Sequence, residues 1–399
     1  MPKILLCSSL NNLTFFAHMW LSFLCIAIIL VFCYCVLILL YYSWFIQLQY
    51  FNPYGAPQPQ NHFTIVIPAR NEEDNIEQCL LSILQNDYPS NLFEVIVADD
   101  FSTDNTVQIV KKLQQQFANL KLIQLEKFVI DKLNSYKKKS IETAIAHSSY
   151  DWIITTDADC KVSYTWLDLF DNYIQKNNVV FIGAPVRFTN NGSFLSIFQC
   201  LDFISLQGIT AASVSAGFHN MCNGANLAYK KEAFYEVNGF KDVDNIASGD
   251  DMLLMHKIGQ RYPGKIGYLF NKEAIVETLP MQNWKSFMNQ RIRWASKATS
   301  YSDKKIFLVL LLVYLTNLCL LLLPLLSFFN SMILFYWFIL LLVKTCSELI
   351  FMLPVAKFFD QQKLLWWFPL MQPFHIVYTI ASGWLGKFGK YEWKGRIVK

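Results

Sequence analysis

Apolar positions are concentrated at the two ends of the chain, and between the ends apolar and polar positions alternate. Residues 15–40 are almost continuously apolar, and this run exceeds the roughly 20 residues that a membrane helix requires. A second apolar block covers residues 306–343, and polar residues around Asn330 divide it in two. We therefore expect an N-terminal transmembrane anchor within residues 1–46 and two transmembrane helices within residues 306–353.

A third apolar stretch, residues 364–386, contains Pro369 and Pro373 and predicts either a spanning helix or an interfacial one. The tail after it, residues 387–399, is rich in Lys and Arg, which favours the cytoplasmic side of a membrane. If the middle of the chain is also cytoplasmic, two spans after it return the chain to that side, so we expect the third stretch to lie at the interface. The chain is then a multi-pass protein of the cell membrane with a cytoplasmic middle domain.

Residues 61–281 have the pattern of an ordinary globular domain, and residues 47–60 form a linker before it. Short apolar runs, which suit strands buried on both faces, alternate with amphipathic helical patterns. The predicted strands are residues 63–67, 93–98, 120–125, 152–156 and 179–183. This alternation predicts an α/β fold with a mostly parallel sheet and right-handed crossovers.

Three helices are predicted between these strands from apolar positions that recur with helical spacing. Asn71 with Asp74 three residues later resembles a capping box, and Ser102 or Thr103 is expected to cap the next helix. The apolar faces comprise Ile76, Cys79, Leu80, Ile83 and Leu84; Val107, Val110, Leu113 and Phe117; and Trp166, Leu169, Phe170, Tyr173 and Ile174.

Composition agrees with this division of the chain. Hydrophobic residues make up 54% and charged residues 16%, whereas ordinary soluble domains have about 25% charged residues. The net charge of +4 gives no reason to expect a nucleic-acid partner. The ten cysteines lack zinc-site spacing, so we expect free thiols facing a reducing compartment. The sequence contains neither a P-loop nor a GxGxxG motif, which argues against kinases and dehydrogenases.

Acidic residues follow two of the predicted strands. Asp99 and Asp100 end one strand, and Asp157 and Asp159 follow another. Because ligands of such sheets bind beyond the carboxyl ends of the strands, we expect these side chains at one edge. The spacing of Asp157 and Asp159 places both carboxylates on one side of an extended segment, where they can hold a divalent cation that grips a diphosphate. The alternative interpretation is a turn whose acids cap a helix or remain solvated.

A basic and aromatic segment, residues 282–305, precedes the second membrane block. Its mixture of Trp284, Phe287 and Trp294 with Lys and Arg predicts an amphipathic helix that lies on the membrane headgroups. The segment contains QRIRW at residues 290–294.

Six motifs occur in a fixed order: IVIPARNEEDNI, VIVADDFSTDNT, TTDADC, NGANLAYKKEAF, SGDDMLL and QRIRW. Together they resemble the membrane-bound family-2 glycosyltransferases, the inverting nucleotide-sugar transferases that include cellulose and hyaluronan synthases. The resemblance covers about residues 61–300. It implies a GT-A fold, with a Rossmann-like, mostly parallel sheet in a cytosolic domain, and it assigns QxxRW to the segment before the membrane helices.

The resemblance also implies roles for individual residues, although Tyr136 stands where the family usually has glycine before a basic residue. Nucleotide binding is implied for Pro68, Arg70, Asn71, Glu72, Asp99, Asp100, Lys137 and Asp157; metal binding for Asp159 and Asp157; the acceptor side for Asn223, Gly224, Ala225, Asn226 and Asp250; and catalysis for Asp251, Gln290, Arg293 and Trp294.

The implied mechanism is a single displacement. Asp251 is expected to deprotonate the acceptor hydroxyl, while Mg²⁺ or Mn²⁺ and Arg293 offset the charge on the leaving diphosphate. Trp294 is expected either to face an acceptor sugar or lipid, or to anchor the helix at the membrane interface.

The expected function is transfer of a sugar from a nucleotide sugar, UDP-linked, to a membrane lipid or lipid-linked saccharide on the cytosolic face. A processive polysaccharide synthase is the alternative within the class, although its channel usually needs more spanning helices. A catalytically silent membrane scaffold or nucleotide-binding module would have no chemical reason to retain Asp157, Asp159, Asp251 and Arg293. A nucleotidyltransferase would not account for residues 290–294.

A charge pair lies within the last part of the apolar block. Lys344 and Glu348 are four residues apart on one predicted helix. Such a pair marks either a functional site or a contact between helices. We expect a contact between helices or a position near the membrane interface, not a functional site.

Overall fold

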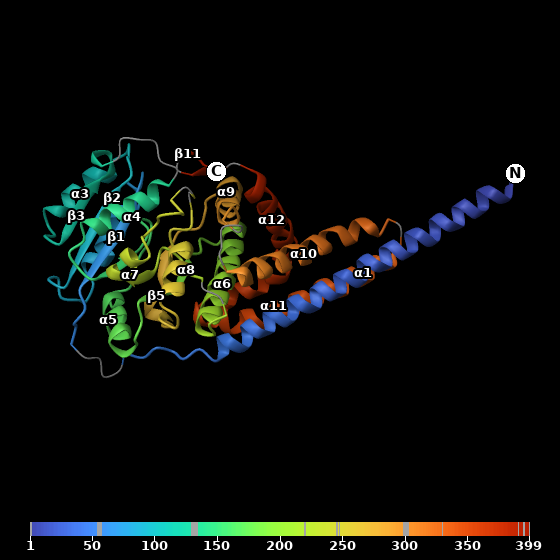
Figure 1. Ribbon diagram of the computed structural model, residues 1–399, viewed down its shortest axis with the longest axis horizontal. Helices are drawn as coiled ribbons and strands as arrows, with labels where there is room; N and C mark the ends of the chain where they lie inside the picture. The colour runs from blue at the N-terminus through green and yellow to red at the C-terminus, as the bar shows by residue number, and fades with distance from the viewer. Residues whose placement is uncertain are drawn as a thin grey trace.

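The computed structural model describes residues 2–53, 58–128, 135–218, 221–244, 246, 248–297, 303–328, 330–389, 391–393 and 396–398, with side chains from residue 20 to residue 389. An α/β domain lies at one end of the molecule, and a long helical arm extends from it (Figure 1). The N-terminal helix packs against two helices from the C-terminal part of the chain in this arm, so the two apolar ends of the sequence lie side by side.

A seven-stranded sheet forms the centre of the domain, in the order β3–β2–β1–β4–β7–β5–β8. The strands β1 to β4 pair in parallel, whereas β7 is antiparallel to both β4 and β5, and β5 and β8 are parallel. The strands are β1 (Phe63–Ala69), β2 (Phe93–Asp99), β3 (Leu120–Gln124), β4 (Trp152–Thr155), β5 (Phe181–Gly183), β7 (Leu227–Lys230) and β8 (Ile266–Tyr268). The predicted mostly parallel α/β sheet and its five strands are confirmed.

Four short strands of the domain were not predicted, because runs of three or four residues show no clear period. Besides β7 and β8, they are β6 (Val186–Phe188) and β9 (Val276–Thr278), which pair in parallel in a separate small sheet. The insertion of β7 between β4 and β5 brings the segment before it, residues 221–226, to the same edge of the sheet as the residues that follow β4.

Helices cover the faces of the sheet (Figure 1). They are α2 (Ile76–Leu84), α3 (Thr106–Gln114), α4 (Tyr136–Ala146), α5 (Trp166–Lys176), α7 (Lys231–Glu236) and α8 (Met252–Arg261). The predicted apolar face of α2 is buried at all five positions. In α3, Val110 and Leu113 are buried and Val107 is partly exposed; Phe117, also partly exposed, lies beyond the end of the helix.

Both predicted helix caps are wrong. The helix α2 begins at Ile76, not after Asn71, and α3 begins at Thr106. Asn71 adopts a positive φ of 51° and its side chain accepts a hydrogen bond from the backbone N–H of Thr103. The loops after β1 and β2 therefore form hydrogen bonds with each other. Asn71, Ser102 and Thr103, which were expected to cap helices, form these bonds between the loops.

Three helices join the domain to the arm. They are α6 (Phe194–Ser215), α9 (Trp284–Ala295) and α12 (Phe368–Phe388). The helix α6 was not predicted, and most of its residues are buried between the sheet and the helices of the arm. The helix α9 lies within the segment predicted as a basic amphipathic helix and packs against α12.

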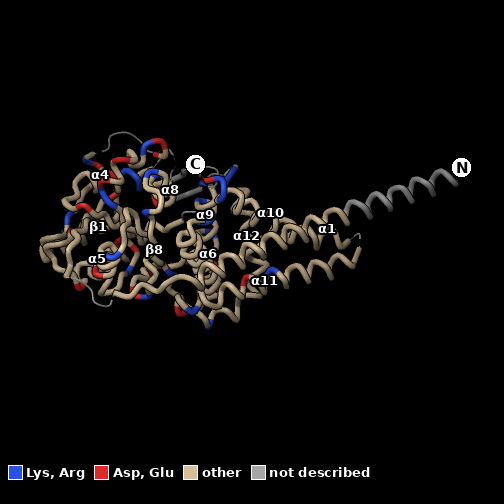
Figure 2. Tube along the Cα trace, turned by 60° about the horizontal axis from the view of Figure 1, so that its bottom comes forward, with Lys and Arg blue, Asp and Glu red and all other residues tan. Residues whose placement is uncertain are grey.

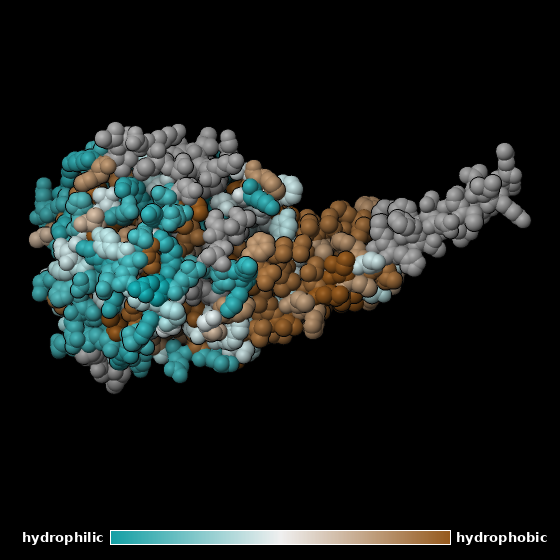
Figure 3. Space-filling view, in the orientation of Figure 1, coloured by the Kyte–Doolittle hydropathy of each residue, from teal (hydrophilic) through white to brown (hydrophobic). Residues whose placement is uncertain are grey.

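The arm consists of α1 (Pro2–Ile46), α10 (Lys304–Leu326) and α11 (Met332–Phe358). Where its side chains are described, the face of the arm drawn in Figure 3 is apolar, and almost all described charged residues lie in the domain and at its junction with the arm (Figure 2). Pro324 lies inside α10, so the break between the two helices begins only after Leu326.

Four described helices are long and apolar enough to cross a membrane: Trp20–Ile46, Phe194–Ser215, Lys304–Leu326 and Met332–Phe358. In Phe194–Ser215, 78% of the apolar window is buried inside the protein, against 33–44% in the other three. The helix α6 is therefore a core helix by its packing, and the three helices of the arm expose the apolar surface that a membrane would cover.

The segment predicted to be interfacial begins with a 3-10 helix, η4 (Gln362–Trp367), and continues as α12. Beyond α12, β10 (Tyr391–Trp393) and β11 (Arg396–Val398) pair antiparallel within the predicted basic tail. Lys390, Lys394 and Lys399 of this tail lie outside the described residues.

Lys344 and Glu348 form the predicted contact between helices. Lys344 Nζ lies 2.7 Å from Glu348 Oε1 and 2.8 Å from Oε1 of Gln372 on α12. Gln372 Nε2 donates to Glu348 Oε2 over 2.7 Å, and the Tyr34 hydroxyl of α1 donates to Oε1. The charge pair therefore joins three helices through polar groups that satisfy one another.

Candidate active site

A cavity of about 1250 Å³ lies between the carboxyl edge of the sheet, α6, α9 and the helices of the arm. It brings together 15 of the 18 residues predicted for the site: Pro68, Arg70, Glu72, Asp100, Lys137, Asp157, Asp159, Asn223, Gly224, Ala225, Asp250, Asp251, Gln290, Arg293 and Trp294. Asn71, Asp99 and Asn226 do not line it. Six motifs that are far apart in the sequence therefore meet at one place.

The loops after β1 and β2 form one end of the cavity. Arg70 Nη1 donates to the backbone carbonyls of Asp100 and Phe101 over 2.7 and 2.8 Å, so this side chain holds the loop after β2 in place. Asp99 is 3% exposed, and burial raises the pKa of its carboxyl group. Of the acidic pair, Asp100 lines the cavity. Asp99 accepts a hydrogen bond from the N–H of Ser102 and so stabilises the loop after β2.

Lys137 of α4 connects two acidic motifs. Its Nζ lies 2.7 Å from Asp157 Oδ1 and 3.2 Å from Asp250 Oδ2. Burial alone would lower the pKa of Lys137, but the two carboxylates outweigh burial and raise it. Burial likewise would raise the pKa of Asp250, but Lys137 and Lys297 hold it below its usual range. Lys137 and Asp250 are therefore both charged at neutral pH, and the contacts of Lys137 connect the end of β4 to the start of α8.

The Asp251 carboxylate is held at the N-terminus of α8. Its Oδ1 accepts from the backbone N–H of Met252 over 2.6 Å, and its Oδ2 accepts from the N–H of Gly224 over 3.1 Å. Lys297 Nζ lies 3.5 Å from Oδ1. A Cβ atom at Gly224 would lie 3.3 Å from Asp250 Oδ2, so the absence of a side chain allows the loop to approach both carboxylates closely.

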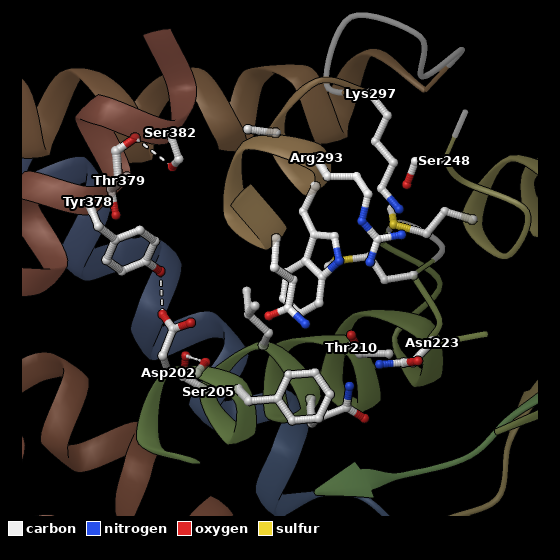
Figure 4. Close-up of a pocket in the computed structure, with 18 of the residues that line it drawn as sticks. Asp202, Ser205, Thr210, Asn223, Ser248, Arg293, Lys297, Tyr378, Thr379 and Ser382 are labelled. Carbon is white, nitrogen blue, oxygen red and sulfur yellow. Dashed lines mark hydrogen bonds between the residues drawn. The ribbon is translucent and has the colours of Figure 1, made fainter. Parts of the chain in front are cut away.

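One residue of the loop before β7, Asn226, stabilises the fold and does not line the cavity. Asn226 is fully buried, and its side-chain amide donates to the carbonyls of Pro185 and Ala274 and accepts from Trp166 Nε1. It therefore joins β7 to three neighbouring segments behind the cavity wall, and the position corrects the expectation that it faces an acceptor. Asn223 does line the cavity, as Figure 4 shows.

The helix α9 presents Gln290, Arg293 and Trp294 to the cavity. Figure 4 shows Arg293 and Lys297 directed toward the same region, beside Ser248 and Asn223. Among the described residues, the Arg293 guanidinium has no hydrogen-bond or ion-pair partner. A half-buried cation without a protein partner is suited to an anionic ligand.

Lys297 was not predicted as a site residue. It is 7% exposed and reaches both the cavity and Asp251. The available signal was its place in the basic and aromatic segment, four residues after Arg293; in the structure it lies just beyond the end of α9.

The cavity continues away from the sheet between the helices of the arm. Tyr34, Glu348, Gln372 and Tyr378 line this part, together with apolar residues of α1, α10 and α11. Asp202, Ser205 and Thr210 of α6 add polar groups to its wall (Figure 4). These residues were not predicted, because only the packing of distant helices brings them to the cavity.

No group of three or more His, Cys, Asp or Glu side chains in the described part of the chain is arranged to hold a metal ion. Asp157 and Asp159 are the carboxylates at the end of β4, and both line the cavity. Mg²⁺ is commonly bound by one or two carboxylates together with phosphate oxygens of the substrate. The donor set therefore fits a cation that arrives with a diphosphate.

Comparison with known proteins gives two overlapping family matches. Residues 152–380 match the family described as glycosyl transferase family group 2, and residues 64–237 match glycosyl transferase family 2. The mannosyltransferase PcManGT from Pyrobaculum calidifontis, solved in complex with GDP-Man and Mn²⁺, has the same fold: the TM-score is 0.56 over 88% of this chain and 99% of that chain, with 20% sequence identity.

Two curated relatives match part of the chain. Poly-beta-1,6-N-acetyl-D-glucosamine synthase of Staphylococcus aureus (strain MSSA476) is 28% identical over 236 residues, 58% of this chain and 53% of that protein. Glycosyltransferase AglE of Haloferax volcanii is 26% identical over 191 residues, 47% of this chain and 58% of that protein. The chain thus spans little more than half the length of these relatives. Its family matches, its GT-A fold and its relatives agree, and the chain belongs to glycosyl transferase family 2.

Proposed function

We propose that this chain is an inverting glycosyltransferase that moves a sugar from a nucleotide sugar to a hydroxyl of a membrane lipid or lipid-linked saccharide. The observation that carries the proposal is that one cavity joins the sheet edge to the arm. It is lined by Asp157 and Asp159 at the sheet edge, by Asp251 and Trp294, and by residues of α1, α10, α11 and α12. An acceptor held in the membrane would enter from the arm, and the nucleotide sugar would bind at the sheet edge.

The sheet edge is the proposed donor site. Pro68, Glu72 and Asp100 line it where a nucleoside would bind. Arg293 supports binding of a diphosphate because its guanidinium has no partner among the described residues. A UDP-linked sugar is the proposed donor, in keeping with the resemblance to cellulose and hyaluronan synthases.

Asp159 and Asp157 would hold a divalent cation, Mg²⁺ or Mn²⁺. When bound there, the cation would neutralise charge on the diphosphate and favour its departure. The hydrogen bond from Lys137 is accepted by Oδ1 of Asp157 and not by Oδ2. Hard cations prefer carboxylate and phosphate oxygens, so this hydrogen bond is compatible with a cation at the same carboxylate.

Asp251 is the proposed general base. It would take the proton of the acceptor hydroxyl as the hydroxyl oxygen attacks the anomeric carbon from the face opposite the diphosphate, which inverts that carbon. The N–H groups of Gly224 and Met252 orient the carboxylate for this task. Arg293 would offset the charge that develops on the leaving diphosphate. Trp294 would present its flat ring to the acceptor.

The proposed location is the cell membrane, with α1, α10 and α11 as the spanning helices and the α/β domain on the cytoplasmic side. The apolar surface of the arm supports the spans (Figure 3). The basic residues of the C-terminal tail support the orientation. The helix α12 would lie at the interface, because it packs against α9 and is not among the described helices that meet the criteria for a span.

A processive polysaccharide synthase is the second candidate. It is favoured by the match to poly-beta-1,6-N-acetyl-D-glucosamine synthase. The two candidates differ in their product, since one forms a lipid-extractable molecule with a defined number of added sugars and the other forms a polymer.

A donor screen tests the proposal. Purified full-length protein in lipid would be given UDP- and GDP-linked sugars with Mn²⁺ and an extract of native membrane lipids, and release of the nucleoside diphosphate would be followed. We expect release with one donor that depends on the lipid extract and stops with a chelator. Binding of nucleotide without release from any donor would instead favour a silent nucleotide-binding module.

A further inference from the structure

The helix α9 carries a buried charge that the proposed mechanism does not use. The side chains of Arg291 and Asp202 of α6 are each 3% exposed, and Arg291 Nη2 lies 2.6 Å from Asp202 Oδ2. A basic amphipathic helix on the membrane surface would point this arginine toward headgroups. Because burial of an ion pair carries a large desolvation cost, its position between helices requires particular contacts.

The Arg291 guanidinium contacts the first and the last residue of the QRIRW motif, Gln290 and Trp294. Its Nη1 donates to Gln290 Oε1 over 2.8 Å. Its central carbon lies 4.3 Å from the ring centroid of Trp294 and 4.7 Å from that of Phe287. One planar cation therefore fixes the amide of Gln290 and the ring of Trp294, which both line the cavity.

Asp202 and Tyr378 complete the arrangement. The Tyr378 hydroxyl of α12 donates to Asp202 Oδ1, as the dashed line in Figure 4 shows. Asp202 thus accepts from α9 through one oxygen and from α12 through the other. The three side chains link α6, α9 and α12 at the wall of the cavity.

We infer that Arg291 is a positioning residue for the transfer reaction, and that Asp202 and Tyr378 orient its guanidinium. Arg291 sets the amide of Gln290 and the ring of Trp294 at the place where the acceptor would lie. The inference rests on the proposed function, which assigns the acceptor to this part of the cavity. A lysine would keep the charge but lose the planar fork that serves Asp202 and Gln290 together and stacks on rings.

The test uses Arg291→Lys in the full-length protein labelled with fluorotryptophan, in lipid. Fluorine NMR reports the environment of each of the 11 tryptophans, and the resonance that Trp294→Phe removes is that of Trp294. We expect Arg291→Lys to shift or broaden this resonance. The matched control is Arg187→Lys, because Arg187 is also an arginine in an ion pair, 2.6 Å from Glu277, although it is only partly buried. The control should leave the Trp294 resonance unchanged.

Turnover gives the second measurement, made below the melting temperature of each variant. With the donor that the wild type consumes, Arg291→Lys should lower kcat by about tenfold or more, while the affinity for UDP with Mn²⁺ changes less than twofold. Tyr378→Phe removes only a hydroxyl and should shift the Trp294 resonance in the same direction by a smaller amount, with a smaller loss of kcat.

An unshifted Trp294 resonance with kcat near that of the wild type would overturn the inference. A lower melting temperature with both quantities unchanged would overturn it too, because the ion pair would then serve stability alone. The resonance requires no substrate, so lack of turnover in the wild type would refute the proposed function and leave the positioning test decisive.

Discussion

Asp251 is the residue on which the proposed chemistry depends most. Two backbone N–H groups and Lys297 surround its carboxylate. An asparagine has the same shape, but only its oxygen can accept, so it keeps one of these two backbone hydrogen bonds and loses the other. We expect Asp251→Asn to lower turnover by about 10²–10⁴-fold, the usual contribution of a general base. Binding of UDP with Mn²⁺, measured by calorimetry, should stay close to that of the wild type.

The control for this substitution is Asp360→Asn, which changes an exposed carboxylate paired with Lys272. Turnover of the control should match the wild type. If Asp251→Asn turned over at the wild-type rate, another group would have to accept the acceptor proton.

Asp159 tests the metal assignment separately from the base. Asp159→Ala removes one of the two carboxylates that fit a cation at the end of β4. We expect its dissociation constant for UDP to be the same with Mn²⁺ as with a chelator, because the cation would no longer link nucleotide and protein. Nucleotide affinity that still rises on addition of Mn²⁺ would refute this assignment.

At the level of elements, α6 and α11 meet at Gly208. A Cβ atom there would lie 2.6 Å from Val355 Cγ2, closer than such atoms approach, and 3.0 Å from Phe351 Cζ, which is a tight contact. We expect Gly208→Ala to lower the free energy of unfolding by about 1–3 kcal/mol through overpacking. Adding Val355→Ala should recover part of this loss in thermal melts, because it removes the methyl groups in the way. Equal losses with and without the second substitution would mean that the two helices do not meet as described.

Glu94, near the N-terminal end of β2, connects the strands β1, β2 and β3 at the end of the sheet away from the cavity. Its carboxylate accepts from Thr64 Oγ1 over 2.7 Å and from Ser149 N–H over 2.6 Å, and it lies 2.5 Å from Lys121 Nζ. Burial alone would raise the pKa of Glu94, but these hydrogen bonds outweigh burial and lower it.

A carboxylate with a lowered pKa stabilises the fold above its unfolded pKa, and this stability is lost as pH falls through the folded pKa. We expect Glu94→Gln to cost about 2 kcal/mol at pH 7, since hydrogen bonds to charged groups contribute this much. The difference from the wild type should shrink below about pH 4.3, the usual pKa of glutamate. Glu142→Gln, at an exposed pair, is the control. A difference that did not change with pH would show that the charge of Glu94 is not involved.

Five strands, the parallel half of the sheet and the motif residues at the sheet edge of the cavity could be predicted, because apolar runs and short motifs carry that information locally. Asn226 and the caps at Asn71 and Ser102 could not, since their hydrogen-bond partners come from segments elsewhere in the chain. The same holds for Arg291, whose partner Asp202 is 89 positions away. Polar residues in a motif suggest a site, but only the fold distinguishes those that face the cavity from those that support it.

In the whole molecule, the cavity connects the proposed nucleotide-binding edge of the sheet with helices that have an apolar outer surface. This connection is the reason for proposing an acceptor that is held in the membrane. The most direct test is mass spectrometry of the lipids recovered after membranes containing the full-length protein are incubated with the donor that the wild type consumes. We predict a lipid-extractable product heavier by one sugar residue, which is absent with Asp251→Asn. A sugar found only in water-soluble products would contradict the account.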